Sequence, residues 1–378
     1  NLKDPELKYK IGIELIPKVG SINAKKLIAY CGSPEAVFKE HKKNLLKIPG
    51  IGEIIATEII NQKILDKAET EIEFIEKYRI KALYYIDAEY PERLKQCEDG
   101  PVVLFVKSNQ DINFNTDKII SIVGTRKATT YGKAICDELI GGIAAKGYSP
   151  IIVSGLAYGI DIAAHKAAIK HQLPTIAVLG HGLNTIYPSA HRNVAKDIAI
   201  HGALVTDFTS ETPFDRNNFL RRNRIIAGLA DATVVVESAE EGGALVTADI
   251  ANSYNREVFA VPGNHEYMLF ASRGIQNYCK RFSVQSLTGY VIVKDSIAVD
   301  AMNTGKWEEV AQKGGTIQDL IKDKKEASLL EKGNKAVKTE QDAEALIADT
   351  LEKIKVEPQN INYYRALARL YSDQKHFD

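Results

Sequence analysis

The residues of this sequence best suited to chemistry are arginines that stand close to glycines, amides and a phenylalanine. One arginine directly follows an apolar run, and others form the phrase Arg221-Arg222-x-Arg224. Arginine holds phosphate oxygens with a fixed fork of N–H donors, a phenyl ring stacks on a base, and an amide hydrogen-bonds a base edge. The residue types therefore suit a nucleic-acid strand. The candidate contact side chains are Arg126, Arg192, Asn218, Phe219, Arg221, Arg222 and Arg224.

Glycine-rich turns follow several of the apolar runs. The longest is Ser154-Gly-Leu-Ala-Tyr-Gly-Ile-Asp-Ile-Ala-Ala-His165, which leads from an apolar run into a helix-forming run. Glycine lets the backbone turn tightly and approach a ligand, and the free N–H groups that begin the next helix attract an anion. We therefore expect phosphate contacts from the turns that contain Ser154, Gly155, Gly180 and Gly243.

Two alternatives compete with these interpretations. Arg221 and Arg224 could instead lie on an amphipathic helix and pair with acids such as Asp231 or Glu237. His165 stands four residues after Asp161, a spacing that suits an acid–base couple but that we interpret as a structural hydrogen bond.

Other candidate catalysts are incomplete. Ser154 lacks a G-x-S-x-G elbow, and His181 and His191 show no metal-ligand spacing with acids or cysteines. We therefore predict no catalytic set and no metal site. The absence of G-x-G-x-x-G and of the P-loop phrase predicts no dinucleotide or P-loop cofactor site.

The elements that must position these residues alternate between strands and helices from about 118 to 263. The apolar runs are Ile119–Val123, Ile151–Val153, Thr175–Leu179, Ala203–Phe208, Thr233–Val236 and Val258–Val261. Nearly continuous apolar strands that alternate with helices predict a parallel sheet covered on both faces. We expect an α/β fold with a Rossmann-like, doubly wound, mostly parallel sheet, and a ligand at the carboxyl ends of its strands.

Composition excludes some classes of protein. The 378 residues carry 49 basic and 49 acidic side chains, so overall charge does not indicate a nucleic-acid binder and any basic patch must be local. The four cysteines show no CxxC spacing, which argues against a zinc site or a disulfide framework. Without a long apolar run or signal peptide, we expect a cytoplasmic protein with no membrane partner. The first and last residues suggest a fragment at both ends.

The first 66 residues contain a repeated phrase. Ile16-Pro-Lys-Val-Gly20 and Ile48-Pro-Gly-Ile-Gly52 share their spacing, and each is followed by a small alanine. The pattern resembles the helix-hairpin-helix motif, also found in SAM-like helical domains, whose loop N–H groups contact DNA phosphates. We predict possible phosphate contacts at Gly50 and Gly52; the first copy has Lys18 where the second has Gly50. The alternative is a helical packing domain that does not touch DNA.

The last 84 residues differ from the rest. From Asp295 the composition is helical and charged, and Tyr364, Leu367, Ala368 and Tyr371 show the spacing of a tetratricopeptide helix. We expect three parts: a helical domain at 1–66, a Rossmann-like domain at 80–293, and a helical, tetratricopeptide-like tail at 295–378.

Several phrases together resemble one family, the bacterial DNA-processing protein A family, DprA or Smf. They are Ile122-Val-Gly-Thr-Arg126, Ser154-Gly-Leu-Ala-Tyr-Gly-Ile-Asp161, Ala177-Val-Leu-Gly-His-Gly-Leu183, Arg222-Asn-Arg-Ile-Ile-Ala-Gly228, Gly242-Gly-Ala-Leu-Val-Thr-Ala248 and Val261-Pro-Gly263. With the N-terminal hairpins, the resemblance covers about residues 1–264. The segment 265–293 echoes the family only faintly, and the tail looks foreign to it.

The resemblance implies a protein that is not an enzyme and needs no cofactor. It implies binding of single-stranded DNA, a homodimer, and loading of a RecA-type recombinase during natural transformation. It also implies that Arg126 holds phosphate, that the segment from Asn218 to Arg224 orients nucleotides, and that Gly155, Gly180 and Gly243 shape the pocket.

A second function stays open at this point, namely a nucleotide-processing enzyme of the nucleoside-monophosphate phosphoribohydrolase kind. Such folds carry a Pro-Gly-Gly-x-Gly-Thr-x-x-Glu phrase. The corresponding turn here, Glu241-Gly-Gly-Ala-Leu-Val-Thr247, lacks its third glycine and its glutamate.

Overall fold

A computed structural model describes residues 4–61, 63–116, 118–239 and 242–261, two strand segments at 285–288 and 291–292, and residue 349. The chain divides into two compact units, the first of Asn1–Val236 and Gly242–Val258, and the second of Glu237–Glu241 and Phe259–Asp378. The tail predicted for 295–378 lies outside the described residues, apart from residue 349. In the described part of the chain, no helix is long and apolar enough to cross a membrane.

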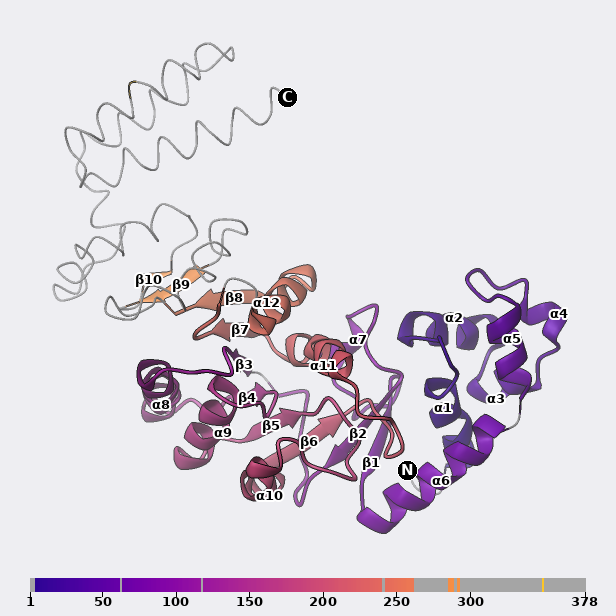
Figure 1. Ribbon diagram of the computed structural model, residues 1–378, viewed down its shortest axis with the longest axis horizontal. Helices are drawn as coiled ribbons and strands as arrows, with labels where there is room; N and C mark the ends of the chain where they lie inside the picture. Colours follow the sequence, from indigo (N-terminus) through magenta and orange to yellow (C-terminus); the bar gives the residue numbers. More distant parts are fainter. Residues whose placement is uncertain are drawn as a thin grey trace. The chain divides into compact units, whose positions relative to one another are not determined.

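The first unit begins with the predicted helical segment (Figure 1). Its helices are α1 (Leu7–Glu14), α2 (Ser21–Cys31), α3 (Pro34–Lys39), α4 (Lys42–Leu45), α5 (Glu53–Ile60) and α6 (Lys63–Tyr78). Apolar side chains from all six are buried together, among them Ile11, Leu27 and Ile59. The segment is short, so it relies on this shared core and on its contacts with the sheet.

Hydrogen bonds from polar side chains join the helical segment to the rest of the first unit. The buried Glu14 carboxylate accepts hydrogen bonds from the backbone N–H groups of Val102 (2.7 Å) and Val103 (3.2 Å). Glu71 accepts from the N–H group of Ser210 at 2.8 Å, and Lys25 donates to the carbonyl of Glu98 at 3.1 Å. Burial raises the pKa of Glu14 and of Glu71.

The sheet of the first unit has the strand order β1-β2-β6-β5-β4-β3-β7. The strands are β1 (Lys81–Tyr84), β2 (Val103–Lys107), β3 (Ile119–Val123), β4 (Ile151–Ser154), β5 (Thr175–Val178), β6 (Gly202–Thr206) and β7 (Ala232–Val235). The strands from β6 to β7 in this order pair in parallel, whereas β2 pairs antiparallel with both β1 and β6. The Rossmann-like, mostly parallel fold predicted from the sequence is confirmed.

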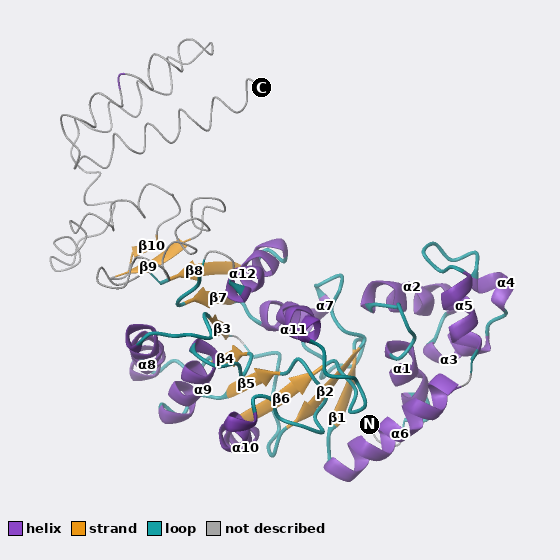
Figure 2. Cartoon of the chain, in the orientation of Figure 1, coloured by secondary structure: helices purple, strands orange, loops and turns teal. Residues whose placement is uncertain are grey.

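Helices cover both faces of this sheet, as Figure 2 shows, with α8 to α10 on one face and α11 and α12 on the other. The remaining helices are α7 (Glu92–Lys95), α8 (Thr130–Ala145), α9 (Ile160–Lys170), η1 (Ser189–His191), α10 (Arg192–His201), α11 (Arg216–Leu229) and α12 (Gly243–Ser253). The central strands are buried on both faces, which explains why they are apolar throughout.

Helix starts agree with local sequence signals. Thr129 accepts a hydrogen bond from the N–H group of Gly132 at 3.1 Å, and so caps α8. Asp215 accepts from the N–H group of Asn217 at 2.8 Å, and so caps α11. These caps satisfy backbone donors that have no partner within the helix.

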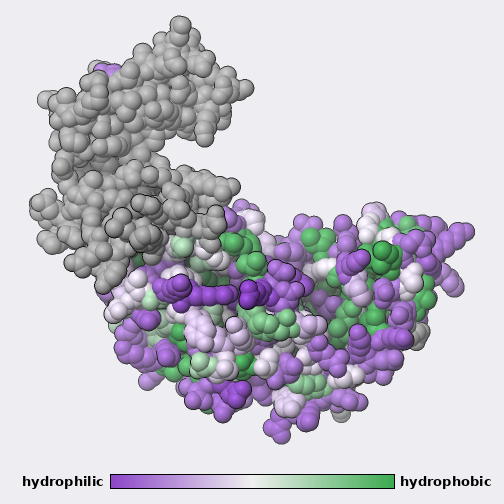
Figure 3. Space-filling model, in the orientation of Figure 1, coloured by the Kyte–Doolittle hydropathy of each residue, from purple (hydrophilic) through white to green (hydrophobic). Residues whose placement is uncertain are grey.

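The chain continues from the first unit into β8 (Glu257–Ala260). Within the second unit, Phe259 and Ala260 pair in parallel with β9 (Gln285–Thr288), which pairs antiparallel with β10 (Val291–Ile292). The face of the first unit that Figure 3 shows is mostly hydrophilic, with smaller apolar patches between.

Candidate nucleic-acid interface

Several of the predicted site residues lie at one edge of the sheet, where β3, β4 and β5 end. These strands are parallel neighbours, so the loops that follow them meet at the same edge. Helix α11 reaches the same edge through Arg222. The guanidinium of Arg222 donates from Nη1 to the carbonyls of Gly155 (2.6 Å) and Val178. We call the surface formed by Arg126, Tyr158, Tyr187, Phe214 and Phe219 the edge site.

Arg222 is a buried cation beneath this edge. Arg222 is 3% exposed, and burial lowers its pKa to about 10. The nearby Asp161 carboxylate has the opposite effect and raises this pKa. Asp161 accepts from the N–H group of Ala157 at 3.3 Å, and burial raises its pKa. The guanidinium therefore stays charged at neutral pH and holds two strand ends together.

Two more of the predicted contact side chains already have partners within the protein. The buried hydroxyl of Ser154 donates to the carbonyl of Ile122 at 2.6 Å. Arg224 forms a largely buried ion pair with Asp207. Ser154, Arg222 and Arg224 therefore support the edge from beneath in this structure, because their polar atoms bond to protein groups.

The alternative prediction that Arg224 pairs with Asp231 or Glu237 is wrong. It pairs with Asp207 and with the Asp99 carbonyl, while Asp231 accepts a hydrogen bond from Arg93 Nε at 2.6 Å. The exposed Arg221 lies over the Phe208 ring, with its Cζ atom 5.3 Å from the ring centroid.

The exposed Arg126 is fixed through its backbone. Gly159 has a φ of +81°, and a Cβ atom at this position would overlap the Thr125 carbonyl. The N–H group of Ile160 donates to that carbonyl at 3.2 Å. Gly159 thus lets the loop after β3 rest on the start of α9, which holds Arg126 at the surface.

A tyrosine connects this loop with the next one along the edge. Tyr158 is 49% exposed, and its ring centroid lies 4.8 Å from that of His191. His191 is itself held by a 2.8 Å hydrogen bond from Nδ1 to the carbonyl of Leu156. Arg192 follows directly and is exposed at the start of α10.

Three aromatic rings form a cluster at the β5 side of the edge. The ring centroids of Phe219 lie 5.4 Å from Phe214 and 5.6 Å from Tyr187, which are 4.9 Å apart. Phe214 and Tyr187 are 54% and 49% exposed. A Cβ atom at Gly180 would lie 2.8 Å from the Phe219 ring, so glycine is what lets α11 approach here.

Amide side chains fix the elements around this cluster. The buried Asn218 donates to the carbonyl of Pro213 at 3.3 Å and so holds the segment that carries Phe214. Asn223 donates to the carbonyl of Gly243 at 3.4 Å, which ties α11 to the start of α12. Asn218 is therefore placed to orient an aromatic neighbour.

Three residues of the edge site were not assigned from the sequence, namely Tyr158, Tyr187 and Phe214. Each is an exposed large aromatic side chain beside glycine, proline or a helix cap. An exposed aromatic at a strand-to-helix turn is the signal that could have identified them.

The histidines near the edge are engaged in structural contacts. His165 donates from Nδ1 to Thr175 Oγ1 at 2.7 Å, because the Thr175 hydroxyl itself donates to Ile152. The sequence predicted Asp161 as the partner of His165, but the structure shows Thr175 in that place. Burial lowers the pKa of His165 to about 3, so the ring is neutral.

His181 is similarly fixed. Its Nδ1 donates to the Gly182 carbonyl at 2.9 Å, and Nε2 accepts from the N–H group of Tyr187 at 3.2 Å. Burial lowers its pKa, which favours this neutral form. Among the described residues, no cluster of three histidine, cysteine or acidic side chains could hold a metal ion.

The two hairpin turns of the helical segment have matching backbones. Lys18 has a φ of +64° and Gly50 a φ of +88°, and Gly20 and Gly52 precede α2 and α5 with closely similar extended conformations. A Cβ atom at Gly50 would lie 3.4 Å from Asn23 Oδ1, near the start of α2. Gly50 and Gly52 are exposed, and their contact with DNA stays a prediction.

Comparisons with known proteins bear on this site. The family model described as DNA recombination-mediator protein A matches residues 81–286. Protein Smf of Synechocystis sp. is 32% identical over 268 residues, which are 70% of this chain and 66% of that protein. DNA processing protein DprA of Bacillus subtilis is 42% identical over 176 residues, 47% of this chain and 58% of that protein.

A solved structure is also similar. The X-ray structure of DNA processing protein A from Streptococcus pneumoniae matches with a TM-score of 0.60 and 27% identity, over 74% of this chain and 94% of that chain. The resemblance stated from the sequence is confirmed. The matches span slightly under two thirds of the Synechocystis relative and 58% of the Bacillus one.

Proposed function

This chain belongs to the DNA recombination-mediator protein A family, and we propose that it binds single-stranded DNA and presents it to a RecA-type recombinase. The strand lies across the edge site. Arg126 holds phosphate, and the aromatic cluster takes unpaired bases on the faces of its rings. Binding tolerates different sequences, because every base has a face that can stack.

One observation carries this proposal: an exposed arginine and a cluster of half-exposed aromatic rings share the edge where three parallel strands end. Tyr187 and Phe214 leave about half of their surface in water, although they pack against Phe219. Rings in this state can accept bases, but a duplex keeps its bases stacked inside. The arrangement therefore favours a single strand.

The test is a salt-titrated comparison of single-stranded and duplex DNA, with wild type, Arg126→Ala and Arg79→Ala. We expect tighter binding of the single strand. Arg126→Ala should weaken that binding for all sequences alike, and should reduce the slope of log affinity against log salt by about 0.7, the contribution of one phosphate contact.

Arg79→Ala is the matched control, since Arg79 is an exposed arginine between α6 and β1 and does not belong to the edge site. Its affinity and salt slope should equal those of wild type. A wild type that prefers duplex, or an Arg126→Ala variant that binds as wild type does, contradicts the proposal.

The recombinase, a homodimer and a role in DNA uptake complete the proposal. The description of the family as a recombination mediator supports the partner. Such a role places the proposed action in the cytoplasm and needs no chemical step. Sedimentation of the full chain tests the dimer, and faster nucleation of a RecA-type filament on protein-coated single strands tests the loading.

A further inference from the structure

A groove lies between α8 and α9 and begins at the edge site. It encloses about 540 Å³. Arg126 and Tyr158 line it as well as the edge, so the two surfaces are continuous. Its lining also includes the cations Lys127, Lys133, Lys166 and Lys170.

The charge of the groove is strongly unbalanced. Five of its lining residues are cations, and Asp137 is the one acid among them. That carboxylate is already bound by Lys170 at 2.7 Å and by His171 at 2.9 Å. Among the described residues, no carboxylate lies within 4.0 Å of Lys133 or Lys166 to pair with it.

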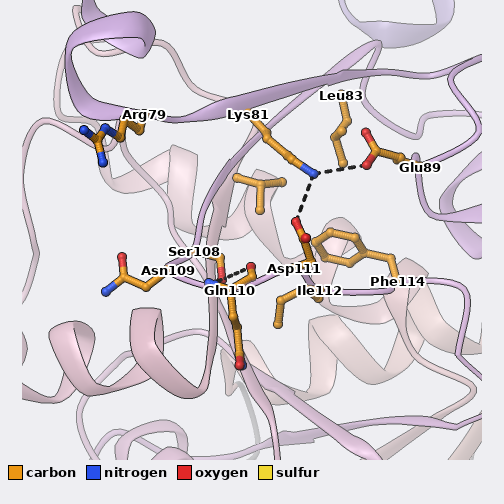
Figure 4. A pocket seen from close by; sticks show the side chains of 11 residues that line it. Arg79, Lys81, Leu83, Glu89, Ser108, Asn109, Gln110, Asp111, Ile112 and Phe114 are labelled. Atoms are coloured by element: carbon orange, nitrogen blue, oxygen red, sulfur yellow. Dashed lines mark hydrogen bonds and ion pairs between the residues drawn. The ribbon is translucent and has the colours of Figure 1, made fainter.

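A second cavity provides a contrast (Figure 4). It lies beside β1 and β2, and Lys81 there is held by Glu89 at 3.0 Å and Asp111 at 3.5 Å. The two carboxylates offset the lysine, so this cavity has no surplus charge to attract an anion. The groove between α8 and α9 lacks such compensation.

The shape of the groove suits a chain of phosphates. The small residues Gly159, Ala163 and Ala167 also line the groove. Lys166 contributes an ammonium group from α9. Lys133 contributes from the facing helix α8.

We infer that this groove is the exit path for single-stranded DNA, and that it holds the phosphates of nucleotides next to those bound at the edge site. The inference rests on the proposed function, since it extends the same strand past Arg126 and Tyr158. Lys133 and Lys166 are the phosphate-binding residues of this path. An acidic protein segment is the competing occupant, but the continuity with exposed aromatic rings favours a nucleic-acid strand.

The experiment uses the full chain and oligothymidylates of about 4 and about 16 nucleotides, the range of site sizes for single-strand binding. Lys133→Ala/Lys166→Ala removes the two groove lysines. For the long oligonucleotide, its affinity should fall about 25-fold at 0.1 M salt and its salt slope by about 1.4, because each contact contributes about 0.7. The short oligonucleotide should bind this variant and wild type alike.

Lys81→Ala/Lys95→Ala is the charge-matched control, since each of these lysines is paired with a glutamate elsewhere. It should bind both lengths as wild type does. If wild type binds neither length, the proposed function fails. If wild type binds both and the groove variant matches it in affinity and slope, only the groove inference is overturned. Polyglutamate that binds through Lys133 and Lys166, with DNA binding unchanged in the variant, would also overturn it.

Discussion

The guanidinium of Arg222 occupies the space that a side chain at position 155 would need. A Cβ atom added at Gly155 would overlap Nη1 and Cζ of Arg222. The same Nη1 atom donates to the carbonyls of Gly155 and Val178. The buried cation therefore explains the glycine without backbone strain, because Gly155 is not among the residues with positive φ.

Gly155→Ala should accordingly destabilise the fold through Arg222. The added methyl group forces the guanidinium away from its two carbonyl partners, which we expect to cost about 2–3 kcal/mol, a typical value for overpacking. Chemical denaturation measures the free energy of unfolding.

A double-mutant cycle with Arg222→Ala isolates the cause. In that background the methyl group has space, so Gly155→Ala should cost less than about 1 kcal/mol. Equal costs in both backgrounds would show that the glycine is needed for another reason.

Phe219→Ala should weaken binding of single-stranded DNA. Loss of one stacked base is worth about 1–3 kcal/mol, or roughly 5- to 150-fold in affinity. Gly180→Ala should reproduce part of this loss, because its Cβ atom would lie 3.0 Å from the backbone Cα of Phe219 and would displace α11. Fluorescence anisotropy with a labelled oligonucleotide measures both.

Tyr148→Ala is the control for this experiment. Tyr148 is 53% exposed and stands between α8 and β4, at the opposite ends of the strands. The Tyr148→Ala variant should bind DNA as wild type does. A Phe219→Ala variant that is no weaker than Tyr148→Ala would remove the aromatic cluster from the interface.

The sequence predicted the central strands well because each is apolar on both faces. The run Ile119–Val123 matches β3, and Ile151–Val153 differs from β4 by one residue. It did not predict that β1 and β2 join the sheet beside β6, since the partner of a strand depends on distant residues and not on its own pattern.

The burial of Arg222 could not be predicted from residue type, because arginine is usually at the surface. Its spacing was informative, however. Asn218, Arg222, Ile225 and Ile226 share the buried face of α11, while Arg221 is exposed. The sequence thus predicted one role for the whole arginine cluster and did not separate the buried Arg222 from the exposed Arg221.

His165 should make stability depend on pH. Its folded pKa of about 3 lies below the ordinary value of 6.5. As the pH falls below 6.5, His165 is protonated in the unfolded chain but stays neutral in the folded protein. The free energy of unfolding therefore decreases by up to about 1.4 kcal/mol per pH unit. His165→Asn should remove that part of the slope between pH 6.5 and 4.

The matched control is His41→Asn, since His41 is exposed. Carboxylates titrate in all three proteins, so their effect cancels in the comparison of denaturation curves. A His165→Asn variant whose slope equals that of wild type would mean that the buried ring takes up a proton in the folded protein.

Arg224→Met should strongly destabilise the protein, because it leaves Asp207 as a buried charge without its partner. The Asp207 side chain is 3% exposed, and its Oδ1 atom has no hydrogen bond. Breaking a buried pair costs about 3–5 kcal/mol, whereas replacing both members costs less. Arg224→Met/Asp207→Asn should therefore be more stable than Arg224→Met in denaturant titrations.

Lys39→Ala is the comparison for the loss of an exposed ion pair. Lys39 and Glu35 lie 2.7 Å apart on α3 with 66% and 37% of their side chains exposed. Its loss should leave the free energy of unfolding almost unchanged, because water screens an exposed ion pair. A double variant that is less stable than Arg224→Met would refute the idea that an unpaired Asp207 causes the loss.

The matching turns of the two hairpins predict opposite effects of opposite substitutions. Lys18→Gly should stabilise the protein by up to about 1 kcal/mol, because a left-handed backbone costs a non-glycine residue about 1–2 kcal/mol, and the greater freedom of glycine in the unfolded chain returns about 0.4–1. Gly50→Ala should destabilise the protein by a similar amount through its backbone. It should cause no clash, since the added Cβ atom would be 3.4 Å from Asn23 Oδ1.

Gly142→Ala is the control for Gly50→Ala. Gly142 is an exposed glycine inside α8, and an added Cβ atom there would meet no neighbouring side chain within 4 Å, so alanine should stabilise the protein by about 0.5–1 kcal/mol. Gly50→Ala and Gly142→Ala must differ in sign in equilibrium denaturation, and a shared sign would mean that the backbone of the second turn carries no strain for alanine.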